Sequence, residues 1–221
     1  MINRRKTAKF LKELLKRDCL TGQKVYWAED VSMDPWAKEE NGNRVDCMQF
    51  LPDNAYTEAD PEKGIFICYE IRTCKKDMYS RNLNFCGNEN YLVTTMRCYK
   101  DILPDLKSGR ALGDIAGTDQ EAPGDIGIMV SVPYHRTAEE EFRKPTRLNN
   151  SKRWRLEIVQ HCGRGSRSKS ADELVFCMYR SGCQKRLQPQ GGKKICFIRF
   201  YFTELKNSLK RQIGGLRRKT G

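Results

Sequence analysis

The sequence predicts an α/β protein in which helices flank a central β-sheet and a basic segment follows the sheet. Residues 65–73 form a nearly continuous run of Ile, Phe, Cys and Tyr, which is typical of a strand buried on both faces. A helical segment and a second apolar strand follow it, at the spacing of a right-handed crossover between parallel strands. The chain has 221 residues, of which 38% are hydrophobic, so it can bury a sizeable core.

Before this unit, apolar residues at helical spacing predict a helix over residues 5–17 that ends near Asp18 and packs on the sheet. Strands are then predicted over residues 24–31 and 45–51. An acidic stretch containing Pro and Gly separates them, and a polar connection leads to the strand at 65–73.

After residue 73 the pattern alternates between helix and strand. The expected order is a helix over 75–83, a strand over 90–95, a helix over 97–103 that Pro104 stops, and a strand over 125–132. We therefore expect a core domain over residues 1–132 and a basic C-terminal extension over 133–221. Within the extension, helices are predicted over 174–187 and 203–216, and a strand over 193–202.

The formal net charge of +13 at pH 7 indicates an acidic partner, and nucleic acid, with DNA as the first candidate, is the one we expect. Basic residues concentrate at the N-terminus, in residues 143–167 and in the last sixteen residues, whereas an even spread would serve only solubility. No apolar run approaches the ~20 residues that cross a bilayer. The N-terminus also lacks the features of a secretory signal, so we expect a cytoplasmic, intracellular protein that does not enter the membrane.

Cysteine chemistry does not account for the function. The ten cysteines are scattered among apolar residues and include no C-x-x-C pair, and there are two histidines. Neither a structural zinc site nor a disulfide framework is expected. The cysteines are predicted to be buried thiols.

Three residues on neighbouring strands form the candidate site. In a strand, residues i and i+2 face the same side, so Glu70 and Arg72 project together while Ile71 enters the core. Asp46 lies on the preceding strand. Two carboxylates suit Mg²⁺ or Mn²⁺, and the arginine can neutralise charge that develops on a phosphate. The alternatives are a turn residue for Asp46 and a same-face ion pair for Glu70 and Arg72.

With Asp46 and Glu70-x-Arg72 in place, the segment 69–80, followed by Asn90-Tyr91-Leu92-Val93 and by residues 125–130, resembles the core of the PD-(D/E)XK nuclease superfamily. It is similar in particular to the MmcB-like and phage-encoded members. The resemblance covers residues 24–132. It implies a restriction-endonuclease-like mixed sheet, and a host cell as the location if the protein is encoded by a phage.

The resemblance implies a magnesium-dependent DNA endonuclease, or a related DNA-processing protein, with Asp46 and Glu70 as metal ligands. Glu29 is a further candidate ligand or else a surface carboxylate. Arg72 stands where the family usually has lysine. A buried lysine can lose its proton and assist the attacking water, but arginine remains charged. The alternatives are therefore a catalytically inactive nucleic-acid-binding protein on a nuclease fold, or an interaction protein that inhibits or recruits a nucleic-acid enzyme.

Further residues have secondary roles in this interpretation. Asp77 is expected to cap the following helix, or else to bond to Arg72. Trp154 is expected to pack in the core, although its basic neighbours also suit a contact with nucleic acid. The basic residues predicted to contact nucleic acid are Lys152, Arg153, Arg155, Arg164 and Arg167.

Overall fold

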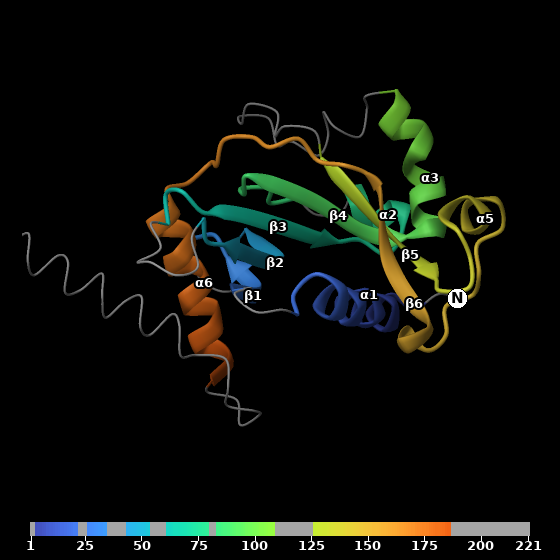
Figure 1. The fold of residues 1–221 in the computed structure, drawn as a ribbon, viewed down its shortest axis with the longest axis horizontal. Helices are drawn as coiled ribbons and strands as arrows, with labels where there is room; N and C mark the ends of the chain where they lie inside the picture. The colour runs from blue at the N-terminus through green and yellow to red at the C-terminus, as the bar shows by residue number, and fades with distance from the viewer. Residues whose placement is uncertain are drawn as a thin grey trace, which may run out of the picture.

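The computed structural model describes residues 3–21, 26–34, 43–53, 61–79, 83–108 and 126–186, the last four by their backbone alone. Within these residues, six strands form one mixed sheet whose spatial order equals their order in the sequence (Figure 1). These strands are β1 (Tyr26–Ser32), β2 (Arg44–Leu51), β3 (Ile65–Ile71), β4 (Glu89–Thr95), β5 (Gly127–Pro133) and β6 (Trp154–Gln160). The pairs β3–β4 and β4–β5 are parallel and the other three pairs are antiparallel.

Helices cover both faces of this sheet. On one face lies α1 (Arg4–Asp18), and the other face carries α2 (Lys75–Tyr79), α3 (Met96–Lys107) and α6 (Ala171–Arg186). The short helices α5 (Ala138–Arg143) and η1 (Ser151–Arg153) lie between β5 and β6. The predicted α/β class, with a mixed sheet flanked by helices, is therefore confirmed.

Helix α1 begins after Asn3, whose side chain accepts a hydrogen bond of 3.2 Å from the backbone N–H of Lys6. Such a cap satisfies one of the N–H groups that a helix start leaves without a partner. One side of the helix is buried, as its apolar periodicity predicts, and packs under β3, β4 and β6. The residues that form this buried side are Thr7, Phe10, Leu11, Leu14 and Leu15.

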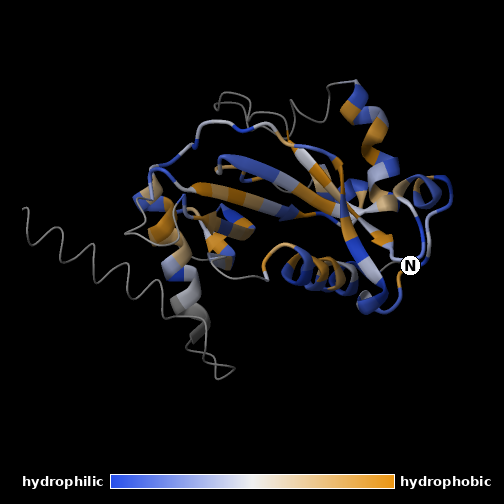
Figure 2. Ribbon diagram, viewed as in Figure 1, coloured by the Kyte–Doolittle hydropathy of each residue, from blue (hydrophilic) through white to orange (hydrophobic). Residues whose placement is uncertain are grey.

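The central strand β3 is buried on both faces, as its apolar run predicts. Ile67, Tyr69 and Ile71 join the hydrophobic cluster under α1, whereas Phe66 and Cys68 join the cluster that includes α3 and α6. Figure 2 shows hydrophobic residues along the strands of the sheet. Because both faces are covered, β3 can carry a charged side chain only where a partner neutralises the charge.

The structure extends the sheet beyond the predicted boundary at residue 132. Strand β6 pairs with β5, with Trp154 opposite Pro133, and α6 packs against β1. Much of the predicted extension therefore contributes to the same sheet and core as the first 132 residues. The helix expected over 174–187 starts slightly earlier, at Ala171. The strand over 193–202 and the helix over 203–216 lie outside the described residues.

Pro104 does not stop the helix that contains it, contrary to the sequence-based expectation. Helix α3 continues to Lys107 with Pro104 inside it. A proline lacks its own N–H and so removes one intrahelical hydrogen bond, while its carbonyl can still accept one. The N–H of Ser108 donates to the Pro104 carbonyl at 3.1 Å, which closes a further turn.

The described cysteines are free thiols. Cys47, Cys68, Cys86, Cys98 and Cys177 are buried, as predicted, whereas Cys19, Cys74 and Cys162 are partly exposed. Among the described residues, none of the helices has the length and apolar character needed to cross a lipid bilayer.

Replacing Trp154 with alanine tests whether the chain after β5 belongs to the same cooperative unit. The Trp154 side chain is 1% exposed and its ring meets that of Phe10 edge to face at 5.5 Å. We expect Trp154→Ala to lower the free energy of unfolding by about 3–5 kcal/mol, measured by urea denaturation.

The matched control is Ile158→Ala in the same strand, where the side chain is 41% exposed. This substitution should lower the free energy of unfolding by about 0.5 kcal/mol, the size of an ordinary surface substitution. If Trp154→Ala were equally mild, β6 and α1 would not share a core.

Candidate functional site

The candidate site lies where β3 ends beside β2. The carboxylate of Asp46, on β2, accepts a hydrogen bond of 2.7 Å from the backbone N–H of Ile71. Ile71 is buried in the cluster under α1, so its neighbours Glu70 and Arg72 face the opposite side of the sheet. The alternation predicted from the sequence therefore places Asp46, Glu70 and Arg72 together.

One nitrogen joins the three side chains. Nη1 of Arg72 lies 3.2 Å from Oδ2 of Asp46 and 3.0 Å from Oε2 of Glu70. It also donates to the carbonyl of Ile71 at 3.0 Å. Both carboxylates thus point at a single cationic position, which the guanidinium fills.

The three side chains differ in their access to solvent. Glu70 is 1% exposed and Arg72 is 3% exposed, while the side chain of Asp46 is 28% exposed. A ligand approaching from solvent would therefore meet Asp46 first. Glu70 can exchange its partner only if Arg72 moves.

Burial raises the pKa of the Glu70 carboxyl to about 8. The positive charge of Arg72 and the N–H of Asn84, which donates to Oε1 at 3.1 Å, oppose this rise, whereas the neighbouring Asp46 carboxyl adds to it. A carboxyl that titrates so far above its usual range, next to a second carboxyl and a cation, is typical of functional sites. The hydrogen bond from Asn84 could not be predicted, because a backbone N–H in an irregular segment leaves no signal in the sequence.

Asp77 has the structural role expected of it. Its Oδ2 accepts hydrogen bonds from the backbone N–H of Thr73 at 3.2 Å and from the Thr73 hydroxyl at 3.0 Å. The Thr94 hydroxyl donates to the carbonyl of Arg72 at 2.7 Å. These bonds fix the chain as it leaves β3 and so fix the start of the Arg72 side chain.

Glu29 does not lie on the same face of the sheet as Glu70 and Arg72, where a third metal ligand would be needed. Its carboxylate forms ion pairs with Lys16 and, at 3.5 Å, with Lys12, both of which belong to α1 on the other face of the sheet. In the described ranges no three or more His, Cys, Asp or Glu side chains cluster as a metal site. A metal ion at the candidate site would therefore rely on Asp46 and Glu70, with water and phosphate as its other ligands, an arrangement that Mg²⁺ accepts.

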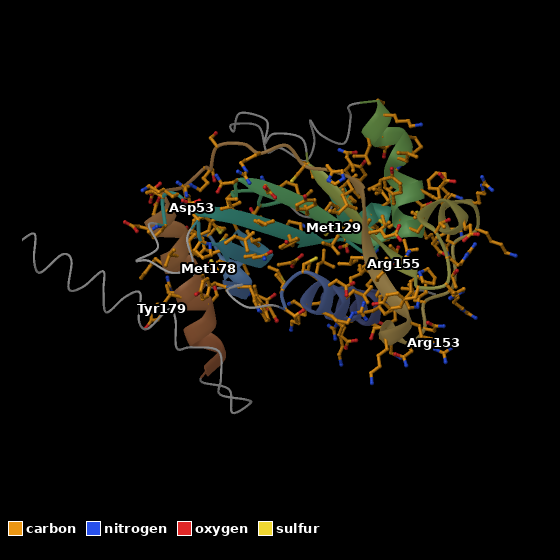
Figure 3. The ribbon with its side chains drawn as sticks, in the orientation of Figure 1. Asp53, Met129, Arg153, Arg155, Met178 and Tyr179 are labelled. Carbon is orange, nitrogen blue, oxygen red and sulfur yellow. The ribbon has the colours of Figure 1, made fainter. Side chains whose placement is uncertain are left out.

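The five basic residues predicted to contact nucleic acid fall into two groups. Lys152 and Arg153 are exposed in η1. Arg155 follows at the start of β6, where its guanidinium bonds to the carbonyls of Pro133 and Arg136 and pairs with Glu157. Figure 3 labels Arg153 and Arg155. Arg164 and Arg167 lie after the other end of β6.

Arg164 and Arg167, the second group, both form ion pairs with glutamate side chains. Arg164 pairs with Glu89 at 3.3 Å, and Arg167 pairs with Glu62. Trp154 is a core residue rather than an exposed platform, since it is buried and its Nε1 donates to Asn149. Lys152 and Arg153 are therefore the members of the set best placed to meet a phosphate.

Comparisons with protein-family models, with curated proteins and with solved structures gave no match to this chain. The chemistry of the described residues is therefore the basis for inferring the function.

Replacing Glu70 with glutamine should change how stability depends on pH. The pKa of Glu70 is near 4.5 in the unfolded chain and about 8 in the folded protein. Between these two pH values Glu70 carries a proton in the folded state but not in the unfolded state. Because the folded state binds more protons in this window, the contribution of Glu70 to stability falls as pH rises. We expect wild type to lose stability from pH 5 to pH 8 more steeply than Glu70→Gln, by up to about 1.4 kcal/mol per pH unit.

Urea denaturation of both proteins at each pH unit from 5 to 8 measures this difference. Parallel curves would mean that Glu70 stays ionised in the folded protein throughout that range.

Proposed function

We propose that this chain is a metal-dependent nuclease or related DNA-processing protein whose centre comprises Asp46, Glu70 and Arg72. The observation that carries the proposal is the convergence of two carboxylates on one cationic position, at the end of the central strand of a mixed sheet. The raised pKa of Glu70 and the net charge of +13 support it.

The donor set fits a hard divalent cation, because both acidic side chains offer oxygen. When bound, such an ion would lower the pKa of a coordinated water and polarise a phosphate oxygen. Asp46, the more exposed acid, would contact the ion first, and Glu70 would be its buried ligand. Arg72 would supply positive charge to the non-bridging oxygens of the phosphate, and it cannot act as the base because it remains protonated.

A non-hydrolytic nucleic-acid-binding protein is the second candidate, and a specific observation favours it. The guanidinium of Arg72 already fills the position between the two carboxyl groups, 3.0 Å from Glu70 and 3.2 Å from Asp46, and Glu70 is 1% exposed. A largely buried group of interacting charges of this kind can serve as a structural element in place of a metal site. Substitution of Arg72 separates the two functions.

A cleavage assay on Arg72 variants tests the proposal. Purified wild type should cut DNA when Mg²⁺ or Mn²⁺ is added, and Asp46→Asn should abolish cutting while the protein stays folded. Arg72→Lys should keep or raise the rate, because lysine keeps the charge and can also transfer a proton. Arg72→Ala should lower it by about 100-fold or more, the usual effect of removing one group that stabilises a transition-state charge.

Glu29→Gln is the matched control, since Glu29 is an acid of the same sheet whose carboxylate faces the α1 lysines. It should cut DNA at the wild-type rate. Failure of wild type to cut any DNA or RNA substrate, together with a loss of about 3–5 kcal/mol of stability in Arg72→Ala, would favour the non-hydrolytic protein.

The salt dependence of binding tests which basic residues meet phosphates. Each phosphate contact contributes about −0.9 to the slope of log K against log salt on duplex DNA. The double variant Lys152→Gln/Arg153→Gln should therefore reduce the magnitude of the slope by about 1.8. Fluorescence anisotropy of a labelled duplex over a salt series measures it.

Arg164→Gln serves as the comparison for this measurement, because Arg164 is paired with Glu89. We expect its slope to equal that of wild type. A reduction by Arg164→Gln as large as that of the double variant would place the DNA at the other end of β6.

A further inference from the structure

A cavity of about 630 Å³ opens at the carboxyl ends of the parallel strands. Thr73 follows β3, Thr95 ends β4 and Ser131 lies near the end of β5, and all three line it. In open α/β sheets ligands bind at this edge. The cavity lies on the α1 side, since Thr7 and Phe10 of that helix and Trp154 form part of its wall. Glu70 and Arg72 face the other side.

The N-terminal ends of two helices contribute to the wall of this cavity. Asn3, the cap of α1, and Lys6 in its first turn line one wall. Thr95, the cap of α3, and Arg97 in its first turn line another. The first turn of a helix has N–H groups without intrahelical partners and carries a partial positive charge, so it attracts anions.

Three cationic side chains add to this positive potential. Lys6, Arg97 and Arg147 line the cavity, and each is exposed. None of the three forms an ion pair with another described residue. By contrast, Glu141, an acid in the cavity wall, pairs with Arg136 at 2.7 Å and accepts a hydrogen bond from the Thr146 hydroxyl. Its charge is therefore already neutralised, and the cavity favours a negatively charged ligand.

A buried hydroxyl without a partner points to the ligand independently of these charges. Ser131 is 0% exposed and lines the cavity, and its Oγ has no hydrogen-bond partner among the described residues. A buried polar group left in this state costs free energy. A ligand oxygen in the cavity would accept the missing hydrogen bond.

We propose that this cavity binds the phosphate group of a phosphomonoester, either a nucleotide or the phosphorylated end of a nucleic-acid strand. The phosphate oxygens meet the N-termini of α1 and α3, the three cations and the Ser131 hydroxyl. The apolar part of the wall, which includes Phe10, Met96 and Leu148, accommodates the organic part of the ligand. The volume lies in the range of small-molecule sites. This site is separate from Asp46, Glu70 and Arg72, and it requires no hydrolysis there.

Equilibrium binding in EDTA tests the site without any metal chemistry. The probes are adenosine 5′-monophosphate and one single-stranded oligonucleotide prepared with a 5′-phosphate, with a 3′-phosphate or with neither. We expect a phosphate-bearing probe to bind at least about tenfold more tightly than the unphosphorylated strand, the size of one or two charge-assisted hydrogen bonds. Adenosine monophosphate binding as tightly as the strand would identify a free nucleotide as the ligand, and preference for a phosphorylated strand would identify a strand end.

Variants of the cavity separate a specific site from general attraction to positive charge. Arg97→Gln and Lys6→Gln should each weaken the phosphate-bearing probe by about tenfold. Their controls are Lys107→Gln, at the other end of α3, and Lys9→Gln, also in α1. Both controls remove one exposed positive charge away from the cavity wall, and both should leave the affinity unchanged.

Ser131→Ala gives a readout that a purely structural role would not produce. Removing an unsatisfied buried hydroxyl should leave the midpoint of thermal unfolding equal to or above that of wild type, while phosphate affinity falls several-fold. Asp46→Asn should bind the probes as wild type does. The phosphate site can therefore be demonstrated even if the protein proves not to be a nuclease. Equal binding of all four probes, or equal losses in Lys107→Gln and Arg97→Gln, would overturn the proposal.

Discussion

Because helices cover β3 on both faces, every charge on that strand must be neutralised inside the protein. Glu70 is the acid in question: burial raises its pKa to about 8, and the guanidinium of Arg72, two residues later and on the same face, lies 3.0 Å from its carboxyl group. The same guanidinium also holds Asp46, which in turn accepts the N–H of Ile71. This small network joins β2 to the end of β3, and the proposed chemistry at the site depends on whether its cation can be exchanged.

The alternation of side chains along β3 divides the functions of the molecule between two faces. On one face, which α2, α3 and α6 also cover, the carboxylates converge. On the other face the same edge of the sheet forms the wall of a positively charged cavity with α1. Thr73 and Arg72 are neighbours in sequence and belong to opposite sides. The parallel order of β3, β4 and β5 brings their carboxyl ends to one edge, which is what makes both arrangements possible.

Local patterns in the sequence correctly predicted those structural features that depend on a single segment of the chain. The strand at residues 65–71, the amphipathic α1 and the shared face of Glu70 and Arg72 all follow from periods of 2 and 3.6 residues. The position of Glu29 could not follow in this way, because its lysine partners are set by the packing of α1 on the sheet. The predicted end of α3 at Pro104 was wrong, and in the further turn Leu106 packs against the hydrophobic core.

The cavity could not be predicted, because its walls come from segments that are distant in the chain. Ser131 and Arg147 carry no motif, and Lys6 is one of several lysines in α1. The one local signal was Thr95, a capping residue placed directly between an apolar strand and a helix. The basic extension was likewise defined by composition, whereas pairing across β5 and β6 is a long-range property of the sheet.

The identity between strand order in space and strand order in the sequence has a consequence for how the protein acquires its structure. Each new strand pairs with the one made just before it, so the sheet can grow from β1 to β6 as the ribosome extends the chain. Sequence separation between paired strands stays small, which favours rapid folding. Helix α1 is the exception: it is synthesised first, yet its apolar face contacts β6, the last of the six strands to emerge. Until then that face has no complete surface to pack on, and a nascent chain arrested before Trp154 would expose it to chaperones.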